Sequence, residues 1–257
     1  MKSNNAPSVT PLSGPAANLD QDIRLPAGTV GILGGLGPLA GAHFYRRLIE
    51  RTSAQNDSGH LPVILLSDPT IPSRVENLFG NGPSPVPALI NLAKLLEKLG
   101  ASVITMPSST THAFYSDISD AIEVEIINLL SEVALVIKKI GSKHPAILAT
   151  TPTVDLDLYR PYLAPRAAPI YPDRVTQDKI HELVFLLKSG TNTNQLSELL
   201  VELISGDWAK GSDSVVLACT ELCLVDTNQL KNGGLNMPVI SATDVLADAV
   251  IAFNHKS

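Results

Sequence analysis

Four short segments of the chain gather side chains that bind ligands or exchange protons. They are residues 34–38 (GGLGP), 68–74 (DPTIPSR), 106–112 (MPSSTTH) and 218–222 (ACTEL). Glycine lets the backbone approach a ligand closely, a guanidinium pairs with a carboxylate through two parallel hydrogen bonds, and a thiol in a favourable setting ionises near neutral pH. The four segments therefore predict ligand-binding turns, one of which carries a candidate reactive thiol.

The first two segments suit an anionic ligand. Segment 34–38 is either a turn that cradles an anion, with Gly35 as a backbone contact, or a tight structural turn before a helix that begins at Pro38. A dinucleotide site is disfavoured, because GILGGLGP departs from the Gly-x-Gly-x-x-Gly spacing. In segment 68–74, two prolines stiffen the loop around Arg74, which is predicted to bind a carboxylate; a solvent-exposed arginine is the alternative.

Four consecutive hydroxyl residues, Ser108, Ser109, Thr110 and Thr111, follow a strongly apolar stretch. Such residues cap helices or donate hydrogen bonds to ligands, and both roles are open here. The neighbouring His112 could act as a base for Ser108, but the Gly-x-Ser-x-Gly pattern of a nucleophile turn is absent. A structural histidine is the favoured interpretation.

Segment 218–222 places Cys219 where a strand is predicted to give way to a helix. A helix N-terminus lowers the pKa of a thiol, which would make Cys219 reactive; a buried, inert cysteine is the alternative. Glu221 suits the first turn of a helix, and Cys223 would share a helical face with Cys219. No metal site is expected, because the six histidines form no spaced cluster.

The elements that must position these segments alternate along the chain. Short apolar runs predict strands at 29–33, 62–66, 102–106, 123–126, 146–149, 168–171, 214–218 and 238–240. Helical spacing predicts helices at 39–51, 87–99, 129–140, 176–187, 194–204 and 244–253. Strands interleaved with helices indicate an α/β protein with mainly parallel, doubly wound sheets, and ligands bind beyond the carboxyl ends of such strands.

The two halves of the chain also resemble each other. TVGILGGLGP and ASVITMPSSTTH in the first half correspond to HPAILATTPT and DSVVLACTEL in the second, at similar spacing. We interpret this as two related lobes whose strand ends face each other, with chance similarity of βαβ units as the alternative. The predicted division is a disordered extension at 1–28, lobe 1 at 29–127, lobe 2 at 128–240, and a closing helix at 241–257 that returns to lobe 1.

Composition restricts the class of protein. The 257 residues are 44% hydrophobic and 17% charged with a formal net charge of −6, which disfavours a nucleic-acid partner. No apolar run approaches the roughly 18–20 residues of a membrane span, and two cysteines make no disulfide scaffold. A cytoplasmic protein without a membrane or nucleic-acid partner is expected.

The four segments, in this order, resemble the aspartate/glutamate racemase family over residues 29–253. GILGGLGP is similar to the family's GxxGGxGP, DPTIPSRV to its NxxIPDRT, ACTEL to its GCTEL, and SATDVLADAVI to its closing helix. The resemblance implies an amino-acid racemase without pyridoxal phosphate or another cofactor, built from two pseudo-symmetric lobes around one site; a homodimer is compatible with it. It puts Arg74 and Lys188 at the substrate and Cys219 at one of two catalytic thiols.

One departure from the family concerns the chemistry. Where the family usually has PCNTAH this chain has PSSTTH, so Ser108 occupies the first catalytic cysteine position and Ser109 replaces an asparagine; Cys223 replaces a common proline. A serine hydroxyl is a far weaker acid than a thiol and abstracts a proton only with a partner base. The site would still stabilise a carbanion beside a carboxylate. The substrate-binding set implied by the resemblance is Arg74, Ser109, Thr110, Thr111, Gly35, Thr153, Thr220, Glu221 and Lys188.

Several functions are compatible with this departure. The first is a racemase of aspartate or glutamate that is impaired or one-directional, in which Cys219 abstracts the proton and Ser108 or a water serves the other face. The second is a racemase in which the catalytic cysteine has been replaced by Ser108 in order to trap a ligand. The third is a one-cysteine decarboxylase or isomerase of a small diacid, and the fourth is a carboxylate-binding protein without turnover.

Overall fold

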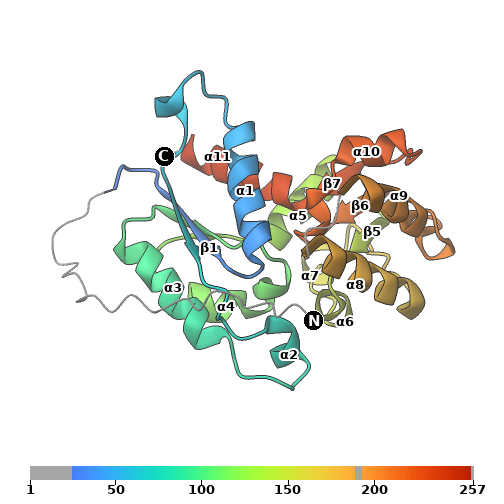
Figure 1. Ribbon diagram of the computed structural model, residues 1–257, viewed down its shortest axis with the longest axis horizontal. Helices are drawn as coiled ribbons and strands as arrows, with labels where there is room; N and C mark the ends of the chain where they lie inside the picture. Colours follow the sequence, from blue (N-terminus) through green and yellow to red (C-terminus); the bar gives the residue numbers. More distant parts are fainter. Residues whose placement is uncertain (1–24, 189–192, 256–257) are drawn as a thin grey trace, which may run out of the picture.

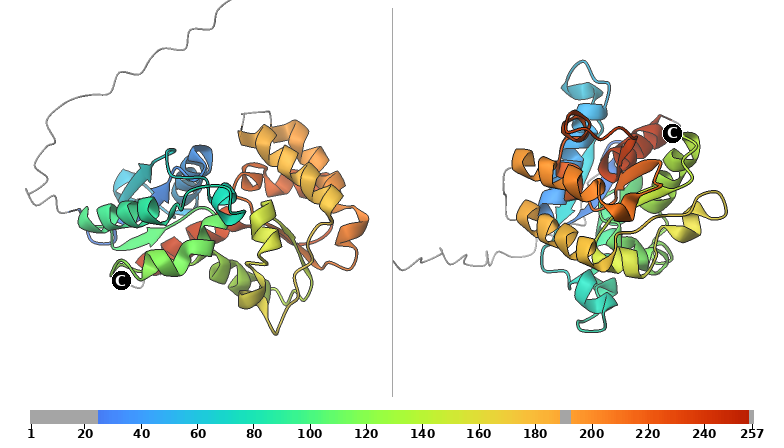
Figure 2. Two further views of the ribbon diagram at one scale, coloured as in Figure 1. Left: turned by 90° about the horizontal axis from the view of Figure 1, so that it is seen from below. Right: turned by 90° about the vertical axis from the view of Figure 1, so that its right-hand side faces the viewer.

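The computed structural model describes residues 25–188 and 193–255, and it shows two parallel sheets flanked by helices (Figure 1). The first sheet has four strands in the order β2-β1-β3-β4, and the second has three in the order β5-β6-β7. The left-hand view of Figure 2 shows the blue and green elements on one side of the molecule and the yellow and orange elements on the other. The predicted two-lobed α/β fold is confirmed. The predicted extension lies almost wholly outside the described residues, and the proposed domain boundaries stay a prediction.

The first sheet is built around a buried central strand. Its members are β1 (Val30–Gly34), β2 (Val63–Ser67), β3 (Val103–Thr105) and β4 (Ile126–Ile127). Strand β1 pairs in parallel with β2 on one side and β3 on the other, and all five of its residues are buried. Helices on both faces account for the continuous apolar run VGILG, since strands covered on both sides need no polar alternation.

The second sheet repeats this arrangement. Its strands are β5 (Pro145–Leu148), β6 (Ser214–Leu217) and β7 (Val239–Ser241), all parallel. An isolated bridge between Ala146 and Ile170 lies beside β5 where β2 lies beside β1. The strand predicted at 168–171 is wrong, because only this bridge forms. Pro169 lacks the N–H that a longer ladder would need.

The helices follow the predicted pattern closely. The six predicted helices are α1 (Pro38–Arg51), α3 (Val86–Lys98), α5 (Leu129–Lys139), α8 (Arg174–Lys188), α9 (Thr193–Ile204) and α11 (Ala242–Asn254), each with ends within two residues of the expected ones. Short helices that were not predicted are α2 (Arg74–Leu78), α4 (Tyr115–Ser119), α6 (Thr151–Asp155), α7 (Arg160–Leu163) and α10 (Thr227–Asn232), with 3₁₀ turns at Thr110–Phe114 and Leu222–Leu224 among others. The short elements follow strand ends or loops, where the apolar period is too brief to read.

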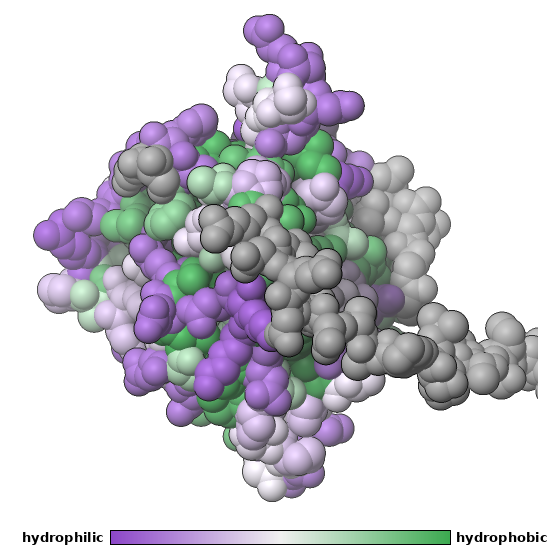
Figure 3. Space-filling view, turned by 90° about the vertical axis from the view of Figure 1, so that its left-hand side faces the viewer, coloured by the Kyte–Doolittle hydropathy of each residue, from purple (hydrophilic) through white to green (hydrophobic). Residues whose placement is uncertain are grey.

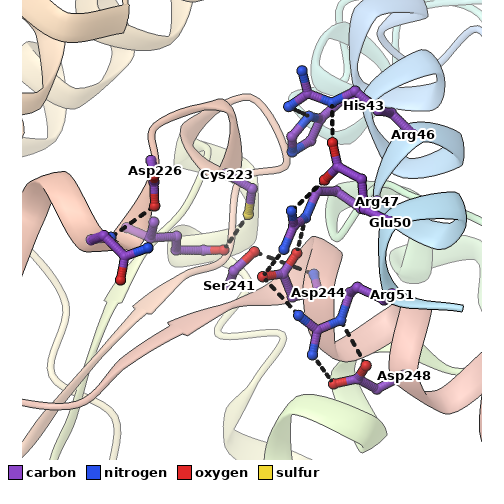
Figure 4. A network of polar contacts seen from close by, with 12 residues as sticks. His43, Arg46, Arg47, Glu50, Arg51, Cys223, Asp226, Ser241, Asp244 and Asp248 are labelled. Atoms are coloured by element: carbon purple, nitrogen blue, oxygen red, sulfur yellow. Dashed lines mark hydrogen bonds and ion pairs between the residues drawn. The ribbon is translucent and has the colours of Figure 1, made fainter. Parts of the chain in front are cut away.

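Helix α11 joins the two halves. It follows β7 of the second sheet, yet it packs on α1 and α5 and touches β3 and β4 of the first. Arg47 on α1 donates to both carboxylate oxygens of Asp244 on α11, at 2.6 and 3.0 Å, and Arg51 donates to Asp248 at 2.7 Å (Figure 4). These ion pairs and the apolar core connect α11, which follows the second sheet, to helices α1 and α5.

The exterior is mixed. On the face that carries the first sheet, hydrophobic and hydrophilic residues are interspersed (Figure 3). Large hydrophobic side chains that remain exposed include Leu39 and Ile49 of α1. Within residues 25–188 and 193–255, no helix has both the length and the apolar character to cross a membrane.

Candidate functional site

The segments that follow strands β1, β2, β3, β5 and β6 line one cavity. In the first sheet the strand order reverses between β1 and β3, and in the second sheet β5 lies next to β6. The segments that leave two such neighbouring strands run in opposite directions, which leaves space for a ligand beyond the strand ends. The cavity measures about 40 Å³, room for about three water molecules. Its lining comprises Leu36, Arg74, Val75, Ser108, Ser109, Thr110, Thr150, Thr153, Lys188, Ala218, Cys219, Thr220 and Glu221.

The structure brings most of the predicted site residues to this cavity. Of the eleven predicted residues, only Gly35 and Thr111 do not line it. Gly35 has a φ of +84°, and a Cβ there would lie 2.3 Å from the carbonyl oxygen of Asp68, so its role is that of a structural turn. Thr150 lines the cavity but was not predicted. The internal repeat was the available signal, since ATTPT of the second half corresponds to the glycine-rich turn of the first.

Cys219 is buried beside a carboxylate. Its Sγ donates to Oε2 of Glu221 at 3.1 Å, and it is 4% exposed. Burial, and then the charge of Glu221, raise the pKa of the Cys219 thiol well above its usual value. The expectation that a helix N-terminus lowers this pKa is wrong, because only a single 3₁₀ turn, Leu222–Leu224, follows the strand. In the protein without ligand, the thiol form of Cys219 is therefore favoured over the thiolate.

Ser108, in the turn after β3, lines the same cavity as Cys219, and among the described residues no base hydrogen-bonds to its hydroxyl. Its Oγ accepts a hydrogen bond from Thr111 Oγ1 at 2.9 Å. His112 lies close, but its Nδ1 is 2.9 Å from the main-chain oxygen of Ser108, and its Nε2 accepts from the amide of Leu129 at 3.0 Å. Burial lowers the pKa of His112 to about 4. The structural interpretation of His112 is thus confirmed, and its use as a base for Ser108 is excluded by these contacts.

The remaining hydroxyl groups tie the two halves together. Ser109 Oγ donates to the carbonyl oxygen of Ala218 at 2.6 Å and lies 3.1 Å from the hydroxyl of the fully buried Tyr159. Thr110 Oγ1 lies 2.7 Å from Thr150 Oγ1 and 3.2 Å from Thr153 Oγ1. These bonds join the turn after β3 to those after β5 and β6, so they fix the cavity walls.

Arg74 is held in place by main-chain oxygens. Its Nη2 donates to Leu36 at 2.9 Å, and its Nη1 donates to Pro72 at 3.2 Å. Ser73 caps α2 by accepting from the Glu76 amide, which sets the start of the helix that carries Arg74. Burial lowers the pKa of Arg74. A buried guanidinium fixed in this way is suited to bind an anion.

Lys188 borders the cavity, whereas Cys223 lies outside it. Lys188, at the end of α8, lies 3.4 Å from Oε1 of Glu221 and its side chain is half-exposed. Cys223 lies outside the lining, and its Sγ donates to the carbonyl oxygen of Leu217 at 3.1 Å. In the described part of the chain, no three His, Cys, Asp or Glu side chains come together as metal ligands.

Comparison with known proteins agrees with this arrangement. Residues 33–250 match the model of the Asp/Glu/hydantoin racemase family. The chain is 26% identical to the broad-specificity amino-acid racemase RacX of Bacillus subtilis, over 87% of this chain and 96% of that protein. It is 32% identical to the aspartate racemase of Picrophilus torridus, with a TM-score of 0.79 over 88% of this chain and 94% of that one.

A more distant structure shares the fold. The aspartate racemase homologue of Pyrococcus horikoshii is 23% identical, with a TM-score of 0.69 over 89% of this chain and 99% of that one. The family match covers nearly all of both sheets and every residue that lines the cavity, and the first two relatives are racemases matched over nearly their whole length. The chain belongs to the Asp/Glu/hydantoin racemase family and is an isomerase of the racemase class.

Proposed function

We propose that the protein racemises an acidic amino acid, aspartate or glutamate, without pyridoxal phosphate, and that Cys219 is its single efficient proton-transfer group. The observation that supports this most is that Cys219, Ser108 and Arg74 line one cavity, with the thiol and the hydroxyl supplied by different halves of the molecule. Arg74 binds the α-carboxylate, and the thiolate of Cys219 removes the α-proton from one face.

The carbanion that results is stabilised by charge and by hydrogen bonds. Arg74 and Lys188 supply positive charge, and the hydroxyl groups of Thr110, Thr153 and Thr220 border the same space. Groups fixed in advance stabilise developing charge without reorganisation. The half-exposed Lys188 lies where the cavity lining meets solvent, which is the side from which an amino acid would enter.

Ser108 makes the two faces unequal. Its Oγ accepts from Thr111, which leaves its own proton free to donate into the cavity, but none of its described hydrogen bonds is to a base. Ser108 can thus return a proton to a carbanion far better than it can abstract one. Because the two enantiomers have equal free energies, kcat/KM is the same in both directions; the asymmetry appears in proton exchange.

The test is α-proton exchange in deuterated water. L- and D-aspartate and L- and D-glutamate are each followed by NMR for loss of the α-proton and by chiral chromatography for inversion. We expect one enantiomer to exchange much faster than it inverts, and its mirror image to exchange slowly. Ser108→Cys should raise inversion relative to exchange, and Cys219→Ala should abolish both.

The matched control is Cys223→Ala, which removes the other buried thiol outside the cavity. It should keep the exchange of the parent protein. Equal exchange of both enantiomers would contradict the assignment of Ser108. Tight binding of these amino acids without exchange would favour a binding protein instead.

A second candidate is a one-cysteine decarboxylase or isomerase of a small diacid. It is favoured by the single thiol of the lining, since protonating a carbanion from one face needs only one acid. The same NMR experiment with a malonate-type diacid distinguishes it, because a decarboxylase would convert one carboxyl group to carbon dioxide in a reaction that Cys219→Ala abolishes.

A further inference from the structure

Glu221 is a buried carboxylate with acceptor capacity to spare. It is 5% exposed, and its Oε2 accepts from Cys219 Sγ at 3.1 Å and from Thr220 Oγ1 at 3.4 Å. Its Oε1 lies 3.4 Å from Nζ of the half-exposed Lys188. A carboxylate has about four acceptor sites, whereas a thiol is a weak donor and the other two contacts are long. Burial of a charge calls for stronger donors than these.

The absence of a side chain at Gly37 leaves room for this carboxylate. Gly37 follows the glycine-rich turn with a φ of +155°, and a Cβ at this position would lie 2.5 Å from Oε1 of Glu221. Any larger residue would press on that oxygen. The glycine at position 37 therefore accommodates the Glu221 carboxylate, in addition to forming part of the glycine-rich turn.

Arg74, in contrast, carries hydrogen-bond donors and a positive charge but has no directly paired carboxylate among the described residues. Its guanidinium donates to main-chain oxygens such as Leu36, and no described carboxylate lies within ion-pair distance of it. Arg74 and Glu221 line the same cavity. The charge of Glu221 reaches Arg74 from beyond ion-pair distance. A ligand that carries a carboxylate and an ammonium on one carbon would supply a directly paired anion for Arg74 and a strong donor for Glu221.

We propose that Glu221 binds the α-ammonium group of the substrate and thereby selects amino acids over diacids that lack an amino group. This inference rests on the proposed function, since it names the feature by which the same cavity recognises its substrate. The α-hydrogen is attached to the same carbon as the ammonium. An ammonium on Glu221 therefore brings the α-hydrogen towards Cys219 Sγ, which lies 3.1 Å from the same carboxylate.

Binding of the ammonium also favours the reactive form of the thiol. In the free protein, the negative charge of Glu221 is one of the causes that raise the pKa of Cys219. A positive charge placed on Glu221 offsets that effect, so the thiolate forms more readily when an amino acid is bound. A diacid without an ammonium brings no such compensation.

Calorimetric binding of two ligands tests the proposal. DL-aspartate is used as the racemate, so that turnover does not change its composition, and succinate is the same diacid without the amino group. A charge-assisted hydrogen bond corresponds to about a tenfold to hundredfold change in Kd. We expect the parent protein to bind DL-aspartate at least about tenfold more tightly than succinate, and Glu221→Gln to lose this preference by weakening aspartate alone.

The matched control is Glu182→Gln, which removes an exposed carboxylate of α8 outside the cavity. It should bind both ligands as the parent does. Equal affinity of the parent for the two ligands, or equal weakening of both by Glu221→Gln, would overturn the proposal. The comparison of DL-aspartate with succinate in the unsubstituted protein tests the proposal even if Glu221→Gln folds poorly.

The two proposals fail separately. Aspartate preference without any α-proton exchange would leave the role of Glu221 intact and refute the racemase. Proton exchange without a preference for aspartate over succinate would support the racemase and refute the role of Glu221.

Discussion

Ser109→Ala provides the sharpest test of how the two halves are held together. The substitution removes two buried hydrogen bonds, to the carbonyl oxygen of Ala218 and to the hydroxyl of Tyr159. Each bond contributes about 1 kcal/mol net, and a buried group left unpaired costs about 1–3 kcal/mol. We expect the free energy of unfolding to fall by about 2–4 kcal/mol. Tyr159→Phe removes one bond and its own hydroxyl, so it should cost about 1 kcal/mol.

Urea unfolding of a double-mutant cycle measures these values. If the 3.1 Å contact is a real hydrogen bond, the double variant is less destabilised than the sum of the single variants by about 0.5–3 kcal/mol. The matched control is Ser205→Ala, whose exposed hydroxyl also donates to a main-chain oxygen, at 2.8 Å, and should cost less than about 0.5 kcal/mol. A Ser109→Ala protein as stable as this control would refute the reasoning.

Two further predictions concern pH. The pKa of His112 is lowered to about 4 in the folded protein, against 6.5 in the unfolded chain, so acid protonates the unfolded state first and favours unfolding. Urea unfolding should show that the free energy of unfolding falls by up to about 3 kcal/mol between pH 6.5 and pH 4. His112→Asn should reduce this pH dependence. Persistence of the same slope in the variant would contradict the assignment. Because the pKa of Cys219 is raised, kcat/KM for exchange should rise about tenfold per pH unit through the neutral range. A pH profile that is flat from 6 to 8 would argue against a thiolate base.

The proposed asymmetry of the site depends on one residue, Ser108. In the proposed mechanism a thiol serves one face of the substrate and a hydroxyl the other, and the pKa difference between the two groups makes proton abstraction efficient from one side only. The structure adds that the neighbouring histidine is committed to Ser108 and Leu129 through both ring nitrogens, and therefore does not compensate. The proposal therefore predicts a kinetic signature, in which proton exchange is faster than inversion, rather than a simple loss of activity.

Much of the fold was predictable from the sequence. Apolar runs such as VGILG and SVVL are long enough, and the helices between them regular enough, that hydrophobic period alone predicts the elements and their parallel pairing. The same pattern predicts that the four turns lie at strand ends, and the internal repeat predicts that they come from two similar halves. Two strand predictions fail. The strand predicted at 123–126 is β4 at Ile126–Ile127, and at residues 168–171 a proline in an apolar run prevents a ladder that composition favours.

What the sequence left open was the environment of each side chain. Neighbours such as the valines of β6 are separated from Pro145–Leu148 by more than sixty residues, and burial and charge depend on contacts across that distance. Only the tertiary structure places Glu221 against Cys219, which reverses the expected direction of the thiol pKa, and commits Ser109 to Tyr159 and Ala218 rather than to a ligand alone. Residue type and spacing determine which groups are present, whereas desolvation and the field of neighbouring charges, which act through space, determine what those groups can do.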